Sequence, residues 1–137
     1  MRYSGRGDIL YHGTAAVEAF EKRGRGVPTG PAWFSEGYGV AKYFMTWGAG
    51  PRPRILTYRV VVQPNLFKFR NMKSLAKLVG LPKEDYVSVE NLENYEPGFW
   101  VERLCATKYD GWIIPDNYID GSDIMICKPE RFLELVP

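Results

Sequence analysis

Glycine and proline interrupt this sequence so often that no long regular element fits between them. The chain has 14 glycines and 10 prolines among 137 residues, and they are spread along its whole length. Glycine favours helix ends and turns, and proline removes a backbone donor, so each tends to end the element before it. The sequence therefore predicts one domain, residues 1–137, that is built from many short strands and helices.

Apolar alternation and helical spacing predict where the short elements lie. The strongest strand signal is Ile55–Val62, which alternates and is β-branched. Other strands are expected at Ile9–Tyr11, Ala32–Ser35, Leu66–Phe69, Trp112–Ile114, Ser122–Lys128 and within 129–136. Helices are expected at Thr14–Arg23 with Thr14 as N-cap, from Ser35 or Gly37 onward, at Asn71–Gly80 and from Pro97 to about Lys108. Residues 115–121 are expected to form a loop. This order predicts an α+β fold with a split, mostly antiparallel sheet and flanking helices.

Charge and cysteine content restrict the class of protein. Lys+Arg number 18 and Asp+Glu 16, and the net charge of +2 is too near neutral to indicate a nucleic-acid partner by itself. Cys105 and Cys127 match no metal spacing, and with a single histidine no zinc site is expected. No apolar run approaches ~20 residues and the N-terminus is polar, so neither a membrane span nor a signal peptide is expected. We expect a cytoplasmic monomer with free thiols.

Three stretches contain candidate site residues. The first is Tyr11-His12-Gly13-Thr14, where His12 is the only histidine of the chain. The imidazole can donate or accept a hydrogen bond there, and Gly13 has no Cβ, so the backbone can approach a ligand. The plainer alternative is that His12 closes a turn. The second stretch is Ala32–Phe44, and the third is Gly121–Cys127.

Together the three stretches resemble the His-Tyr-Glu class of ADP-ribosyltransferases, which includes diphtheria-toxin-like and poly(ADP-ribose)-polymerase-like enzymes. The matching segments are Tyr11-His12-Gly13-Thr14, Ala32-Trp33-Phe34-Ser35 with Ala41-Lys42-Tyr43, and Ser122-Asp123-Ile124-Met125-Ile126. The resemblance implies the split-sheet core of that family and NAD as co-substrate. It also implies transfer of a single ADP-ribose to a macromolecular acceptor, as in a toxin or a phage effector.

The resemblance assigns a role to several matched residues. The backbone of Gly13 would pair with the nicotinamide amide, His12 would bond a ribose hydroxyl, and Thr14 would lie near the adenosine end. Trp33 and Tyr43 could sandwich the nicotinamide ring, because an aromatic face attracts a flat cation by ~0.5–2 kcal/mol. The alternative is that both rings belong to the core.

The last stretch supplies the expected catalytic acid. Strand alternation would put Trp33 and Ser35 on the ligand side and Phe34 in the core. Asp123 matches the acidic position of the family, where a carboxylate stabilises the oxocarbenium-like transition state. That acid is ordinarily glutamate, so Asp123 is one methylene short, and Trp33 stands where tyrosine is common. Other nearby acids are Asp116, Asp120 and Glu130.

Three functions therefore remain open from the sequence. The first is a mono-ADP-ribosyltransferase. The second is a degenerate member of the same fold that binds a nucleotide or a partner protein without turnover, which the shorter Asp123 motivates. The third is a nucleic-acid-binding module with exposed aromatic rings and the arginines Arg23, Arg25, Arg52 and Arg54.

Overall fold

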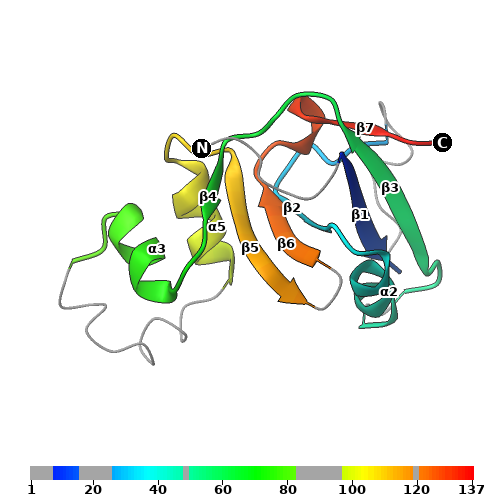
Figure 1. Cartoon of the computed structure of the whole chain (residues 1–137), viewed down its shortest axis with the longest axis horizontal. Helices are drawn as coiled ribbons and strands as arrows, with labels where there is room; N and C mark the ends of the chain where they lie inside the picture. Colours follow the sequence, from blue (N-terminus) through cyan, green and yellow to red (C-terminus); the bar gives the residue numbers. More distant parts are fainter. Residues whose placement is uncertain (1–7, 16–25, 48–49, 83–96, 119–120) are drawn as a thin grey trace.

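Seven strands form one mixed sheet in the computed structural model, which describes residues 8–15, 26–47, 50–82, 97–118 and 121–137. The strands are β1 (Ile9–Thr14), β2 (Ala32–Ser35), β3 (Arg54–Val60), β4 (Leu66–Lys68), β5 (Gly111–Tyr118), β6 (Gly121–Ile126) and β7 (Leu133–Leu135). Their order is β4-β5-β6-β2-β1-β3-β7 (Figure 1). Of the pairs in this sheet, β4–β5 is parallel and the others are antiparallel. The predicted α+β class with a mostly antiparallel sheet is confirmed.

The sheet is nearly divided between β1 and β2. These strands share one register pair, Tyr11 with Ser35. By contrast, β1 pairs with β3 along its whole length, and β2 pairs with β6 along its whole length. We call the junction of β1 and β2 the seam. It separates β4-β5-β6-β2 from β1-β3-β7, so each half can curve independently of the other.

The described helices are α2 (Tyr38–Trp47), α3 (Met72–Leu78), α5 (Pro97–Cys105) and the 3₁₀ turn η2 (Pro129–Arg131). Helix α3 begins with a capping box, in which the Asn71 side chain accepts from the Ser74 backbone N–H. Helix α2 lies against the end of β1 (Figure 1). It comes so close that a Cβ on Gly13 would overlap the Ala41 carbonyl oxygen. Gly13 is therefore required for the packing of α2 on β1.

Each face of the sheet carries its own core. Phe34, Ile124 and Ile113 are register partners across β2, β6 and β5, and they pack with Leu10 and Tyr58 on one face. The neighbouring positions point to the opposite face. There α3 and α5 cover a second cluster, formed by Leu75, Ala76, Trp100, Leu104, Trp112, Met125 and Cys127. The second face is thus apolar beneath α3 and α5.

One local prediction differs from the structure. The predicted loop over residues 115–121 begins as strand, because β5 continues to Tyr118 past an irregularity between Ile114 and Tyr118. Such a bulge accommodates Pro115 in a strand. Thr14 is the last residue of β1, where it is buried and paired with Arg54. The predicted helix beyond it, residues 16–23, lies outside the described residues, so the N-cap role of Thr14 stays a prediction.

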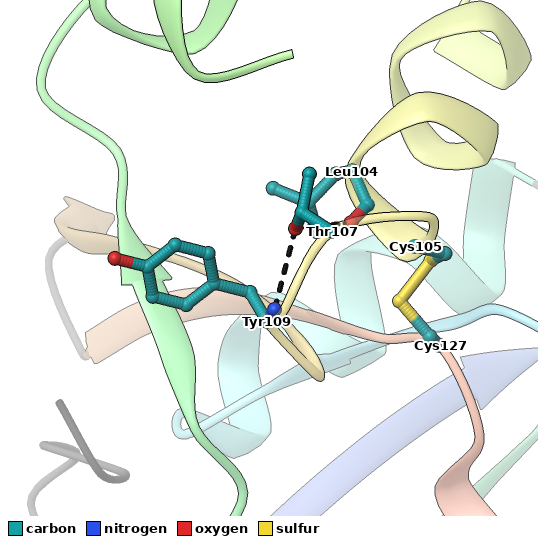
Figure 2. The surroundings of a disulfide bond; sticks show 5 residues. All are labelled: Leu104, Cys105, Thr107, Tyr109 and Cys127. Atoms are coloured by element: carbon teal, nitrogen blue, oxygen red, sulfur yellow. Dashed lines mark hydrogen bonds between the residues drawn. A yellow bond between two sulfur atoms is a disulfide. The ribbon is translucent and has the colours of Figure 1, made fainter.

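A disulfide joins Cys105, the last residue of α5, to Cys127, which directly follows β6 (Figure 2). The Cα atoms are 5.8 Å apart. The Thr107 hydroxyl donates to the Leu104 carbonyl and accepts from the Tyr109 backbone N–H, which turns the chain from α5 toward β5. The prediction of free thiols is therefore wrong, since spacing along the chain does not determine distance in the fold. The cytoplasmic expectation loses this support, because stable disulfides are rare in reducing compartments.

Within the part of the chain that the structure describes, no helix has the length and apolarity to cross a membrane.

Removing the disulfide should lower the free energy of unfolding. Cys105→Ser combined with Cys127→Ala frees a loop whose ends are 22 residues apart, which corresponds to about 3 kcal/mol in the chain-entropy model. Urea unfolding of the variant and of wild-type protein with and without reductant measures the change. Reduced wild-type protein should match the double variant. Equal stability of oxidised and reduced wild-type protein would contradict a stabilising bond.

Candidate functional site

A cavity of about 460 Å³ opens at the seam. Cavities of roughly 300–1,000 Å³ with mostly apolar walls and a few polar groups are typical of small-molecule sites. The described residues that line it are Tyr11, His12, Gly13, Trp33, Phe34, Ser35, Ala41 and Asp123. They come from β1, β2, α2 and β6, which the fold brings together from distant parts of the chain.

His12 bridges the seam with its side chain. Its Nδ1 lies 2.7 Å from the carbonyl oxygen of Trp33. A carbonyl oxygen can only accept, so Nδ1 is the donor of this bond. The ring centroid is 5.6 Å from that of Phe34. His12 is thus held in one orientation at the cavity wall.

Among the described residues that line the cavity, Asp123 is the one with a carboxylate. It lies opposite Ser35 in the β2–β6 pairing and is only 7% exposed. Burial raises the pKa of the Asp123 carboxyl from 3.8 to about 6, and a hydrogen bond from the Ile124 backbone opposes this in part. The group is still about nine-tenths ionised at pH 7. The site therefore holds a negative charge within apolar walls, where electrostatic interactions are strong.

Glu36 holds the start of β6 in place. Its backbone N–H donates to the Ser122 carbonyl at 3.1 Å, and its carboxylate Oε1 accepts from the Ser122 backbone N–H at 3.1 Å. Gly121 has φ +148°, and a Cβ there would lie 2.9 Å from the Cβ of Glu36. The Ser35 hydroxyl donates to the Gly37 carbonyl and closes the same corner. Glu36 therefore fixes the backbone immediately before Asp123.

Aromatic rings form the walls and the rim. Trp33 is 39% exposed, and its ring lies at 63° to that of Trp112 with centroids 5.2 Å apart. Tyr11 lines the cavity and meets Tyr38 edge-on, with centroids 5.6 Å apart. Trp33 and Tyr11 thus bring aromatic surface to the cavity, and Trp33 remains partly exposed there.

Five of the predicted site residues line the cavity, namely His12, Gly13, Trp33, Ser35 and Asp123. Thr14 and Tyr43 are not among the described lining residues, and Tyr43 is 52% exposed on α2. Phe34 belongs to the core, as expected, and also contributes to the cavity wall. Among the alternative acids, Glu130 is exposed on η2, and the side chains of Asp116 and Asp120 lie outside the described residues.

Sequence reasoning missed Glu36, Tyr38 and Ala41 as parts of the site or its support. Ser35-Glu36-Gly37 reads as an ordinary helix start, and no local signal links Glu36 to Ser122 across 86 positions. Ala41 was noticed only as part of a matching segment, whereas the structure places it in the cavity wall against Gly13.

Comparisons with protein-family models, with curated proteins and with solved structures find no match for this chain. The described residues contain no group of three or more His, Cys, Asp or Glu side chains arranged to hold a metal ion. The resemblance to ADP-ribosyltransferases therefore stays a prediction, which depends on the residues of the cavity.

Substitution of Glu36 should loosen the start of β6. Glu36→Ala removes the acceptor for the Ser122 N–H and should lower the free energy of unfolding by about 1–2 kcal/mol. Glu36→Gln keeps an acceptor oxygen and should preserve most of that energy. Amide hydrogen exchange at Ser122 measures the local effect, with the exposed Glu134→Ala as a control. Unchanged Ser122 protection in Glu36→Ala would contradict the role of this contact.

Asp123→Asn should stabilise the protein at neutral pH. The carboxyl pKa is higher in the folded state, at about 6, than its ordinary value of 3.8. Well below pH 3.8 the carboxyl is protonated in both states and costs no stability. As pH rises from 4 to 6, the Asp123 carboxyl ionises first in the unfolded state. The free energy of unfolding of the wild-type protein therefore falls by about 3 kcal/mol, and this loss persists above pH 6. Urea unfolding at pH 4 and pH 7.5 should show the variant's advantage only at pH 7.5. An equal difference at both pH values would contradict the raised pKa.

Proposed function

We propose that this protein is an NAD-dependent mono-ADP-ribosyltransferase, which transfers ADP-ribose to a macromolecular acceptor and releases nicotinamide. The observation that carries the proposal is a single cavity that combines exposed aromatic surface, a fixed imidazole and a buried carboxylate. These groups are Trp33, His12 and Asp123, from three segments that match the family motifs in order.

The residues of the cavity fit the chemistry of NAD. The nicotinamide ring of NAD is flat and cationic, and the face of Trp33 offers stacking and cation–π attraction. Tyr11, and not Tyr43, supplies the second aromatic surface in the lining. A negative charge at Asp123, held in low dielectric, attracts the same cation. His12, held through Nδ1, lines the same cavity, where its imidazole could hydrogen-bond a ribose hydroxyl.

The reaction breaks the bond between the nicotinamide nitrogen and the ribose carbon. The bonding electrons leave with nicotinamide, and positive charge develops on the ribose. The Asp123 carboxylate would stabilise that charge, as carboxylates do in glycoside cleavage. Because its pKa is about 6, the same group is also basic enough to orient an acceptor and take up its proton near neutral pH.

One observation favours the second candidate, a nucleotide-binding protein without turnover. Asp123 has a short side chain and is 7% exposed, so it reaches less far into the cavity than a glutamate would. NAD should raise the melting temperature under both candidates, but only the enzyme consumes it. Measurement of nicotinamide release therefore separates them.

Substitution at Asp123 is the direct test of catalysis. Asp123→Asn removes the charge but keeps the size. It should lower nicotinamide release on the order of 10²–10³-fold and weaken NAD binding far less than that, because the charge that develops in the transition state gains more from the carboxylate than the ground state does. Asp123→Glu restores the usual family residue and should retain activity if the backbone allows it. The exposed Glu130→Gln serves as the matched control. A wild-type rate in Asp123→Asn would show that Asp123 is not the catalytic carboxylate.

The pH profile gives an independent check on the same group. Activity should require the ionised carboxylate, so the rate should rise with pH through about 6 and level off above it. Initial rates of nicotinamide release between pH 4.5 and 8 would measure this. A rate that is independent of pH across the interval would contradict the role of Asp123.

A further inference from the structure

A long acid-free segment lies within this nearly neutral chain. Residues 37–83 contain nine lysines and arginines and no aspartate or glutamate. The net charge of the segment is +9, and because the whole chain carries +2, the remaining residues carry −7. The near-neutral total therefore conceals a strong asymmetry of charge, which is a signal for an anionic partner.

One end of this segment exposes aromatic rings beside its cations. Helix α2 exposes Tyr38 (57%) and Tyr43 (52%), with the exposed Lys42 between them. The helix contains no acid. Among the described residues, Trp33 is the third large aromatic side chain that is exposed, and it lines the cavity. Exposed ring faces are costly in water and often mark a binding surface.

Arg52 extends this surface past the end of the helix. The exposed Arg52 donates its backbone N–H to the Ala15 carbonyl, and Arg54 pairs with Thr14. Arg54 donates from Nη1 to the Arg52 carbonyl and its Nη2 is buried, so its guanidinium is engaged by the protein itself. Arg52 therefore lies near the end of β1, the strand against which α2 packs.

The surface adjoins the cavity. Tyr38 contacts Tyr11, which lines the cavity, and Ala41, one turn further along α2, lines the cavity too. We define the α2 surface as Tyr38, Lys42, Tyr43 and Arg52. A ligand on this surface would lie next to the cavity mouth.

We propose that the α2 surface binds a single-stranded nucleic acid. Lys42 and Arg52 would neutralise phosphates, and the faces of Tyr38 and Tyr43 would stack on unpaired bases. Proteins that bind single strands combine these two features, a cationic track and aromatic platforms. A duplex keeps its bases stacked on one another and cannot use the rings. An acidic peptide could use the cations, but it has no planar groups to match two exposed tyrosines.

This inference goes beyond the proposed function and does not depend on it, since binding is measured without NAD. The probe is a fluorescein-labelled oligothymidylate of about 12 nucleotides, within the usual site size for such surfaces. Fluorescence anisotropy at low and moderate salt gives Kd and its salt dependence. The same sequence as a duplex and a poly-glutamate peptide as competitor test the alternatives.

Two variants and one matched control decide the outcome. Lys42→Glu should raise Kd and reduce the salt slope, and Tyr38→Ala with Tyr43→Ala should raise Kd about fivefold or more while the salt slope persists. The matched control is Lys77→Glu, which makes the same change at an exposed lysine of the acid-free segment. Lys77 lies on α3, which packs against the β4–β5 end of the sheet, away from α2. This variant should leave Kd within about twofold of the wild-type value. All positions are exposed, and unchanged melting temperatures verify folding.

Five results would overturn the proposal, the first four of them in comparisons of ligands and lysine variants. These are no binding of the single strand at low salt, equal weakening by Lys77→Glu and Lys42→Glu, equal affinity for the duplex, and displacement of the strand by poly-glutamate at matched charge. Retained affinity after loss of both tyrosines would also overturn it, because simple charge attraction would then be sufficient.

Discussion

The hydrogen bond from the His12 imidazole to the Trp33 carbonyl holds the two halves of the sheet at the spacing that the cavity needs. Backbone pairing between β1 and β2 is confined to Tyr11 and Ser35. Full pairing would bring the strands to about 4.8 Å and leave no cavity, whereas no contact would let the halves separate. A side chain that spans the seam satisfies a backbone carbonyl while keeping the strands apart. The cavity therefore depends on the one histidine of the chain.

The buried carboxylate is the second constraint, because a charged group in apolar surroundings lowers the stability of the fold. Strand β6 is anchored at both ends around it. Glu36 fixes the start of the strand through Ser122, and the disulfide at Cys127 ties its end to α5. Between these anchors, Ile124 and Ile126 are fully buried on one face and Met125 on the other. This packing offsets the unfavourable burial of Asp123 and keeps its side chain at the cavity wall.

Local signals predicted much of the fold, and contacts between distant residues account for what they missed. The strand Ala32–Ser35 was predicted at its observed bounds, because a short apolar run between turns has few alternatives. Asp123 was predicted from its match to the acidic position of the family motif, and it does line the cavity. Tyr43 was expected in the site, but it is 52% exposed on α2, because its position depends on how that helix packs on β1 and no local pattern determines this packing. The disulfide and the Glu36 contact likewise join residues that no local pattern connects.

Helix α2 links the cavity to the surface beside it. Its backbone approaches β1 so closely that a Cβ on Gly13 would overlap the Ala41 carbonyl oxygen. This placement of the helix puts Ala41 in the cavity wall and leaves Tyr38, Lys42 and Tyr43 exposed. It also separates opposite charges, with the negative Asp123 inside and the positive Lys42 outside. A cationic ligand group is attracted inward and an anionic one outward, so two ligands of unlike charge could occupy adjacent sites without competing.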